Sequence, residues 1–427
     1  MIKKIIAGLC LLVSTVAFSQ EHNASPYSFY GLGDVKFKGT AENRSMGGLG
    51  ILPDSIHVNL QNPATYSALK FTTFTLAATT SSTKLKTADA SDKAGRTTID
   101  YLAVALPLGK VGVTFGVMPY TAVGYRIQST TPPNEPVYGD TLTRSNQFNG
   151  DGGINRVFAG ASFKITPKFS VGADFQYFFG DITTKSITAL PYSGMQYRTQ
   201  EVNKSSYSGV GVKIGAVYQT LINKKYNWYT SAVYTAQTSL QSDTQREIST
   251  IAVSASGTII TNDVLAISLP NKNVAMPSVI AVGTGIGQAR KWFVGAEYTT
   301  EQTSKLRNRY DDITNAKHEN SQKISLGGYY IPKFMSYTSY LSRITYRAGL
   351  KYEKTGLVIS DEPINDTSLS LGIGLPLSGS IGGSNLNIGL ELGKRGTTNA
   401  GLVQENYFNL FVGLSLNDKW FVKRKYE

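Results

Sequence analysis

The sequence contains little cysteine, little charge and no long apolar run. Its single cysteine, Cys10, falls in an N-terminal apolar stretch, so the chain that follows has no disulfide, no thiol nucleophile and no cysteine metal site. Charged residues make up 17% of the chain, against about 25% in soluble domains. Beyond residue 19 no run of roughly 20 apolar residues occurs, which excludes a helical membrane protein. An aromatic content of 11% excludes a disordered chain, so all-β architectures remain.

Histidine is also scarce, which bears on catalysis and metal binding. His22, His57 and His318 lie far apart in the sequence, and none has a neighbouring ligand at metal-site spacing. No serine, histidine and acid are arranged as a hydrolase would need them. We therefore expect no catalytic residue, no metal and no cofactor, and we interpret the protein as a non-enzyme.

Basic residues outnumber acidic ones, 42 to 29, which gives a formal net charge of +13. Nucleic-acid binding would need a stripe of Lys and Arg with interleaved aromatic residues, and only the C-terminal tail approaches such a stripe. That tail, residues 417–427, carries Lys419, Lys423, Arg424 and Lys425. We expect acidic outer-membrane lipid or an envelope polymer such as lipopolysaccharide as the counterpart of this charge, and no nucleic acid.

Residues 1–19 have the pattern of a cleaved secretory signal peptide. Two lysines, Lys3 and Lys4, precede an apolar core over residues 5–16, and the small-x-small pattern of residues 17–19 marks the cleavage site. A retained N-terminal anchor is the alternative, but the segment is too short to span a bilayer. A lipoprotein is disfavoured because Cys10 lies in the middle of the apolar core.

Residues 71–416 consist of stretches with period-two alternation, separated by turn residues. In residues 407–416, for example, Phe408 and Leu410 share one face while Asn409 lies on the other. The less apolar face is rich in glycine, where a soluble sandwich would carry Lys, Glu and Thr. A plug inside a barrel explains these glycines, because they let another backbone approach closely. We predict an all-β fold, a 14-stranded antiparallel transmembrane β-barrel with an N-terminal hatch in its lumen, and a secreted β-sandwich is the alternative.

Long and short connections alternate along the expected barrel, as in outer-membrane barrels whose short turns are periplasmic. The expected long connections are residues 82–97, 129–147, 182–204, 241–246, 303–320, 354–366 and 395–405. The strand number is fourteen if residues 248–287 form one strand interrupted near Pro270 and Pro277, and fifteen if they form two. Bacterial barrels have even numbers of strands, so we predict fourteen, with both termini in the periplasm.

The segment before the first strand, residues 20–70, is rich in glycine and turn residues. Within it, Gly47 and Gly48 precede the motif Asn62-Pro63-Ala64, which lies just before the first strand. This arrangement resembles the N-terminal hatch of the FadL family of outer-membrane channels for long-chain fatty acids and other hydrocarbons. The resemblance implies that residues 20–70 form a hatch inside the barrel and that the protein lies in the outer membrane of a Gram-negative cell.

A stretch of the third expected strand, which contains Gly116, Pro119 and Tyr120, is similar to the family's strand whose kink opens the barrel wall toward lipid. Pro119 also removes a hydrogen-bond donor from this strand. The resemblance implies passive uptake of a small hydrophobic, fatty-acid-like molecule through the hatch and this lateral opening.

The polar outer loops and the basic tail, residues 417–427, depart from the family's pattern. They suit PorV-like relatives, which are partners of other envelope machinery. The alternative function is therefore that of an accessory barrel subunit in a larger outer-membrane complex, such as a secretion machinery, docked to another envelope protein through the tail or the outer loops.

Seven charged residues fall on the lumen side of the expected strands. They are Asp174, Lys213, Glu297, Arg347, Lys351, Glu353 and Glu391. Such residues either line a pathway or hold the hatch by salt bridges, and we favour the salt bridges because buried ionic groups are usually paired.

Overall fold

The computed structural model describes residues 25–131, 144–189, 197–253, 258–306, 315–377 and 383–420. The predicted signal peptide, residues 1–19, and tail residues 421–427 lie outside them. The strands are β1 (Asp34–Val35), β2 (Thr72–Lys86), β3 (Ser91–Leu108), β4 (Val111–Thr131), β5 (Arg144–Thr166), β6 (Phe169–Ala189), β7 (Tyr197–Ile222), β8 (Tyr226–Thr235), β9 (Thr238–Val253), β10 (Ile259–Ser268), β11 (Lys272–Met276), β12 (Val279–Gln288), β13 (Trp292–Glu301), β14 (Ala316–His318), β15 (Ser321–Tyr330), β16 (Thr345–Ile359), β17 (Glu362–Pro376), β18 (Asn385–Arg395) and β19 (Gln404–Asp418).

Helical segments are few and short. They are η1 (Pro26–Phe29), α2 (Ala41–Arg44), η2 (Pro63–Ala68), η3 (Thr303–Lys305), η4 (Leu341–Arg343) and η5 (Asn399–Gly401). Within the described part of the chain, no helix has the length and apolar character needed to cross a membrane.

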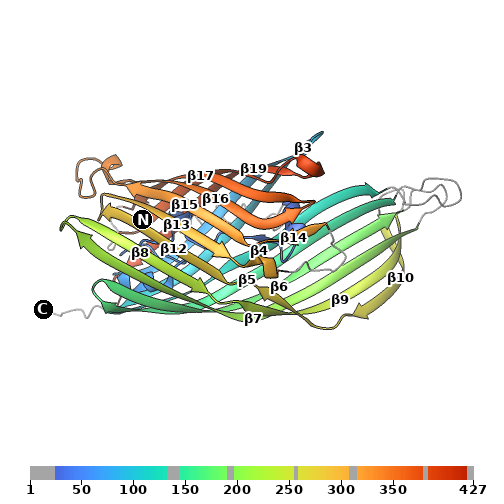
Figure 1. The fold of residues 1–427 in the computed structure, drawn as a ribbon, viewed down its shortest axis with the longest axis horizontal. Coiled ribbons are helices and arrows are strands. Elements are labelled where there is room, and N and C mark those ends of the chain that lie inside the picture. Colours follow the sequence, from blue (N-terminus) through green and yellow to red (C-terminus); the bar gives the residue numbers. More distant parts are fainter. Residues whose placement is uncertain are drawn as a thin grey trace.

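The strands pair antiparallel around a closed barrel (Figure 1). β19 pairs with β2 along its whole length and closes the wall. β8 and β9 both pair with β7 and together form one wall strand. β10, β11 and β12 form the next wall strand against β9 and β8, and β14 and β15 form one against β16. With the short β1 set aside, the wall has fourteen strands, which confirms the prediction.

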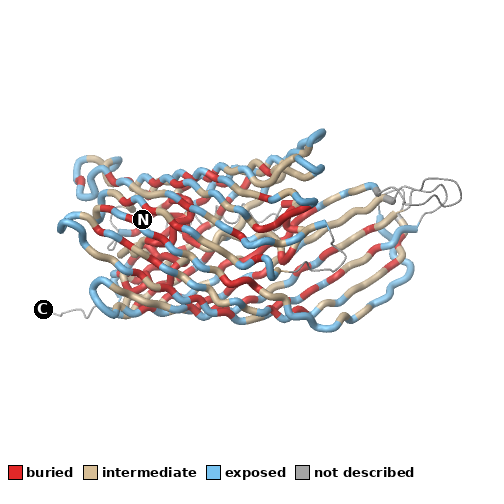
Figure 2. The backbone as a smooth tube through the Cα atoms, in the orientation of Figure 1, coloured by how far each residue is buried: buried red, intermediate tan, exposed pale blue. Residues whose placement is uncertain are grey.

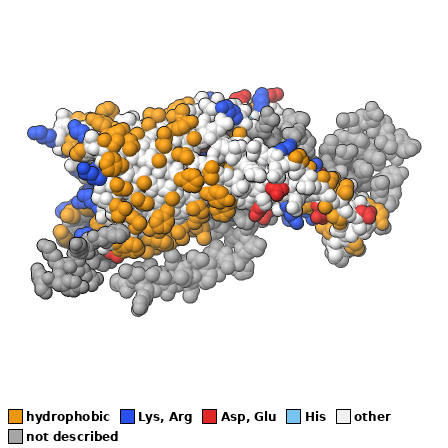
Figure 3. Space-filling model, turned by 90° about the horizontal axis from the view of Figure 1, so that it is seen from below, with side chains coloured by type: hydrophobic (Ala, Val, Ile, Leu, Met, Phe, Trp, Pro, Cys, Tyr) orange, Lys and Arg blue, Asp and Glu red, His pale blue; other side chains and the backbone are white. Residues whose placement is uncertain are grey.

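Period-two alternation separates a lipid-type outer face from a filled interior. In β7, Val210, Val212 and Ile214 are exposed, whereas Lys213 between them is buried. Apolar side chains form a band over the outside of the barrel, and Lys and Arg gather at one end (Figure 3). Buried residues concentrate inside the barrel toward the same end (Figure 2).

The two ends of the barrel differ in their connections. One end, here called the short-turn end, has turns such as residues 109–110, 167–168 and 223–225, and β19 ends there (Figure 1). At the opposite end, here called the long-hairpin end, β4, β5, β6, β7, β9 and β10 project well beyond the other strands (Figure 1).

Several predicted connections are wrong. Residues 241–246 lie inside β9, and the chain reverses only between β9 and β10. Residues 248–253 therefore belong to β9, and the interrupted strand runs from β10 to β12, with Pro270 and Pro277 in its two breaks. Residues 82–97 and 354–366 are also mostly strand, with turns at residues 87–90 and 360–361. These parts extend past the apolar band, where neither face is apolar and the alternation that marks a strand disappears.

Candidate functional site

Residues 25–70, here called the hatch, lie in the lumen and contact the wall from several sides. η2 packs against β4, β5, β6 and β7, while α2 packs against β17, β18 and β19. The side chain of Asn62 accepts a hydrogen bond from the Ala64 N–H at 3.0 Å and so caps η2, which Pro63 begins. A Cβ on Gly172 of β6 would lie 2.6 Å from the Pro63 carbonyl carbon, so this wall strand needs glycine opposite the motif.

Gly47 and Gly48 turn the chain at the end of α2. Both have positive φ, 70° and 86°, a conformation that glycine adopts without strain. The turn places the hatch backbone directly on the wall: a Cβ on Gly349 of β16 would overlap Gly47, and a Cβ on Gly327 of β15 would overlap Met46. Glycine on the inner face therefore gives the hatch backbone room to contact the wall backbone.

Asp174 and Lys213 connect the wall to the second half of the hatch. The Lys213 ammonium lies 2.9 Å from an Asp174 carboxylate oxygen and donates a hydrogen bond to the Leu60 carbonyl at 2.8 Å. The Tyr66 hydroxyl donates to Asp174 at 3.3 Å. All of these side chains are buried, so the pair satisfies its charge inside the protein.

Glu391 and Glu297 connect the wall to the first half of the hatch. The Arg44 guanidinium donates to Glu391 through Nε at 2.8 Å and lies 2.7 Å from it through Nη2. Glu297 accepts a hydrogen bond from the Gly50 N–H at 2.9 Å. Asp174, Lys213, Glu297 and Glu391 thus all contact the hatch directly.

The other three predicted charges contact different partners. Arg347 donates to Asn387 at 2.9 Å, and Asn387 in turn donates to Glu42 of the hatch at 2.7 Å. Lys351 pairs with Asp366 of the neighbouring strand at 2.9 Å. Glu353 lines the cavity described next.

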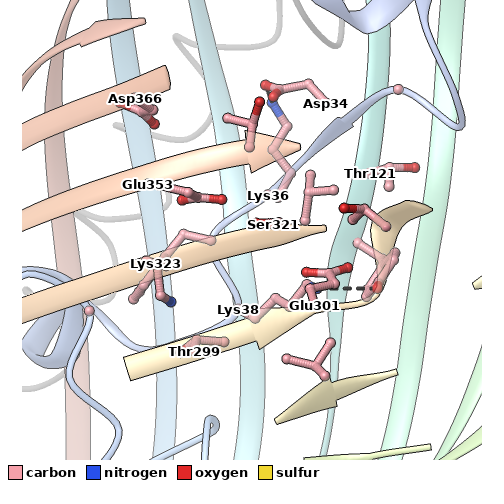
Figure 4. Close-up of a pocket in the computed structure, with 18 of the residues that line it drawn as sticks. Asp34, Lys36, Lys38, Thr121, Thr299, Glu301, Ser321, Lys323, Glu353 and Asp366 are labelled. Carbon is pink, nitrogen blue, oxygen red and sulfur yellow. Dashed lines mark hydrogen bonds and ion pairs between the residues drawn. The ribbon is translucent and has the colours of Figure 1, made fainter. Parts of the chain in front are cut away.

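A cavity of about 420 Å³ lies between the hatch and the wall. The close-up shows charged side chains entering it from both (Figure 4). The hatch supplies Asp34, Lys36 and Lys38, and β13, β15, β16 and β17 supply Glu301, Lys323, Glu353 and Asp366. Apolar surface comes from Tyr27, Leu32 and Phe37 of the hatch. The cavity therefore presents polar and apolar groups together.

Two cations flank Tyr120 in this cavity. The Lys38 ammonium donates to the Tyr120 hydroxyl at 3.1 Å and lies 4.4 Å from the ring centroid. The buried Arg156 guanidinium lies 5.8 Å from the same centroid and donates to Gln176 at 3.2 Å. Among the described residues, no carboxylate lies within ion-pair distance of Arg156. This corner of the cavity is suited to an anionic group.

Lys36 titrates far from its usual range. Burial, together with repulsion from the nearby Arg96 and Arg44, lowers the pKa of Lys36 to about 7. Attraction to Asp34 and Asp100 acts in the opposite direction and offsets only part of this shift. The folded protein then binds fewer protons than the unfolded chain between pH 7 and the ordinary lysine pKa of about 10.4, so stability from this group rises with pH over that window. Below pH 7 the cavity gains a positive charge.

This titration is directly measurable. After reductive ¹³C-methylation of the lysines, we expect one NMR resonance of the folded protein to titrate with a midpoint near 7. The resonance should disappear in Lys36→Arg, which assigns it. A Lys36 midpoint above about 9, near the ordinary value, would contradict the burial argument.

The wall is interrupted beside the cavity, between β3 and β4. Their pairing runs from Leu108↔Val111 to Leu102↔Val117, and beyond it the described residues show no further β3–β4 pair. β4 continues along β5, with a register irregularity between Pro119 and Thr121. The hatch strand β1 pairs with β4 there, at Thr121 and Ala122.

The predicted residues Gly116, Pro119 and Tyr120 thus lie where the pairing ends. Both strands that flank the interruption also line the cavity, β3 through Arg96 and Asp100 and β4 through Tyr120 and Thr121.

Sequence reasoning missed the hatch's own contribution. Asp34, which pairs with Arg395 at 2.6 Å, and Arg44 carry much of the hatch-to-wall contact, yet the hatch has no periodicity that would indicate which side chains face the wall. The one available signal for Arg44 was its place beside the glycine turn.

Within the described residues, no group of three or more His, Cys, Asp and Glu is placed to hold a metal ion.

Comparison with known proteins gives the family. The profile of the BamG family matches residues 1–427, the whole chain. The chain belongs to the BamG family. No curated protein matches.

Solved structures show the fold that this BamG-family chain shares. The CymD monoaromatic hydrocarbon channel has a TM-score of 0.57 and 15% identity, with 91% of this chain and 98% of the other covered. The toluene transporter TbuX of Ralstonia pickettii has a TM-score of 0.58 and 16% identity, covering 89% and 99%. A Pseudomonas aeruginosa FadL homologue has a TM-score of 0.56 and 12% identity, covering 90% and 98%. The resemblance to FadL-type barrels is therefore one of fold, and the family is BamG.

Proposed function

We propose that this protein is an outer-membrane channel for passive uptake of small amphipathic, fatty-acid-like molecules, which enter the cavity between the hatch and the wall and leave sideways between β3 and β4. The observation that carries the proposal is the end of β3–β4 pairing at Leu102↔Val117, beside a cavity lined by both strands. Two solved structures of the same fold support the proposal, because their names describe a monoaromatic hydrocarbon channel and a toluene transporter.

The lining of the cavity supports an amphipathic cargo over a pure hydrocarbon. Lys38 and Arg156 offer charge to a polar head, and Leu32 and Phe37 offer apolar surface to a tail. A hydrocarbon would leave the charged groups desolvated and unpaired. Release into lipid needs no energy source, because transfer of the apolar tail from water to hydrocarbon is favourable.

A disulfide between the hatch and β4 tests this route. Residues 20–427 contain no cysteine, so Val35→Cys with Thr121→Cys creates a single pair between residues that are register partners. Antiparallel partners lie about 4.5–5.5 Å apart between Cα atoms, which is within disulfide range. Because oxidation fixes β1 against β4, we expect uptake of radiolabelled oleate by cells to fall severalfold and to recover with reductant.

The matched control places the same bond in the intact part of the wall. Leu102→Cys with Val117→Cys joins β3 to β4 at their last register pair and leaves the hatch free, so uptake should continue when it is oxidised. Equal uptake by both oxidised pairs would show that cargo does not pass β1.

A structural subunit of a larger envelope assembly is the second candidate. The observation that favours it is β10, which projects at the long-hairpin end and is exposed on almost every residue of both faces, including Ile260 and Leu265. Replacing both with Lys separates the two functions. A channel keeps its uptake, whereas a subunit loses a protein that co-purifies with it from native membranes.

A further inference from the structure

The lipid-type face of the barrel carries an apolar groove near the short-turn end. Its floor is formed by two small register partners, Gly328 of β15 and Ala348 of β16. The next outward row on one side is Leu326 and Leu350, and on the other side Tyr330 and Tyr346, all large and exposed. Small residues between two rows of large ones leave a groove of about 710 Å³, which also extends over Leu371 and Leu390.

Lysine and arginine occur in the two connections at the short-turn end of this groove. Arg290 and Lys291 lie in the turn before β13, and Lys333 and Arg343 lie in the connection between β15 and β16. Residues 289–292 and 331–344 contain no Asp or Glu. Tyr330 and Tyr346, which line the groove, are only three residues from Lys333 and Arg343, or about 10 Å of extended chain.

The β15–β16 connection, residues 331–344, is folded and carries exposed apolar side chains. The Lys333 N–H donates to the Ser342 carbonyl at 2.7 Å, and the Tyr340 hydroxyl donates to the Pro376 carbonyl at 3.0 Å. Tyr337 is 96% exposed and Leu341 is 66% exposed. The connection lies at the short-turn end of the barrel (Figure 1), where an interfacial position in the bilayer would cover these side chains.

We propose that this groove and its basic rim hold one anionic phospholipid of the periplasmic leaflet, with an acyl chain over Gly328 and Ala348 and the phosphate at Arg290, Lys333 and Arg343. Hydrocarbon surrounds this face of the barrel, so the groove is filled by an acyl chain, which restores the dispersion contacts that the small residues leave unmade. The phosphate can accept hydrogen bonds from Arg290 and Lys333, which are both exposed, and from the partly exposed Arg343. Four cations without a carboxylate favour an anionic lipid over a zwitterionic one.

Native mass spectrometry of the delipidated full-length protein tests the site. On titration with phosphatidylglycerol, we expect one lipid to be retained, and phosphatidylethanolamine to be retained at least about fivefold less. Ala348→Leu fills the groove, and the triple variant Arg290→Gln, Lys333→Gln, Arg343→Gln removes the rim. Each should lower retained phosphatidylglycerol at least about fivefold.

Matched controls make the same changes elsewhere. Ala173→Leu enlarges an exposed alanine on β6, and the triple variant Lys168→Gln, Lys224→Gln, Lys225→Gln removes equal charge from other short turns. Both should retain the lipid, and heat-dependent gel mobility checks that every variant is folded. Equal lipid loss in variants and controls would overturn the proposal. It would also be overturned if a protein that co-purifies with the barrel from native membranes bound the same rim and displaced the lipid. The result is independent of the proposed uptake.

Discussion

Gly349→Ala is expected to displace the hatch from the wall. A Cβ at this position of β16 would overlap backbone atoms of Met46 and Gly47, which have no flexible end that could move aside. Overpacking of this kind costs about 1–3 kcal/mol, and backbone overlap places the cost toward the upper end. We therefore expect a lower thermal transition in detergent and a larger single-channel conductance in planar bilayers.

The control for this prediction is another glycine of the inner face. A Cβ on Gly211 of β7 would lie 3.0 Å from the ring edge of Phe178, and its three nearest atoms all belong to wall side chains and not to backbone. Gly211→Ala should keep conductance and thermal transition close to those of the unchanged protein. If Gly349→Ala behaves in the same way, the hatch does not depend on the close approach at Gly47.

Removal of Glu391 is expected to be the most damaging single change to the charge network. Its carboxylate accepts from Arg44 at 2.8 Å and from Asn409 at 3.1 Å, and Lys351 lies 3.8 Å away. Among the described residues, Glu391→Ala leaves the largely buried Arg44 cation with Thr79, a distant Asp100 and the ring faces of Phe37 and Phe411 as partners, and none of these is a close carboxylate. Breaking a buried pair from one side costs about 3–5 kcal/mol.

Denaturant unfolding of single and double variants measures this coupling. Because the double variant Arg44→Met, Glu391→Leu removes both charges, we expect it to recover part of the stability that Glu391→Ala loses. Asp361→Asn, which breaks the exposed pair with Lys317, should leave unfolding unchanged because that pair is in solvent. Equal losses in the single and double variants would mean that packing, and not charge, holds this part of the hatch.

The sequence supported the barrel and several parts of its site for identifiable reasons. Strands in the lipid band show alternation that only a sheet explains, and the glycines of the inner face indicated that something approaches closely. Pro119 could be singled out because a proline inside a strand removes a ladder hydrogen bond. It lies where β3–β4 pairing ends.

Other features carry no local signal in the sequence. Residues 241–246 are strand, but both faces there are polar, so period-two hydrophobicity could not show it. Arg44 and Asp34 belong to an irregular segment, and their partners Glu391 and Arg395 are more than 300 residues away in the chain. Such pairs are defined by the closed barrel alone.

The hatch strand β1 has a consequence for how the protein is assembled. Beyond Val117 along the chain, β4 has no β3 partner among the described residues. Two hatch residues, Asp34 and Val35, pair with β4 there instead. A strand edge without partners is costly in hydrocarbon. We therefore expect the N-terminal segment to act as an internal template for the third wall strand, so that docking of this segment and completion of the barrel are coupled during insertion into the membrane.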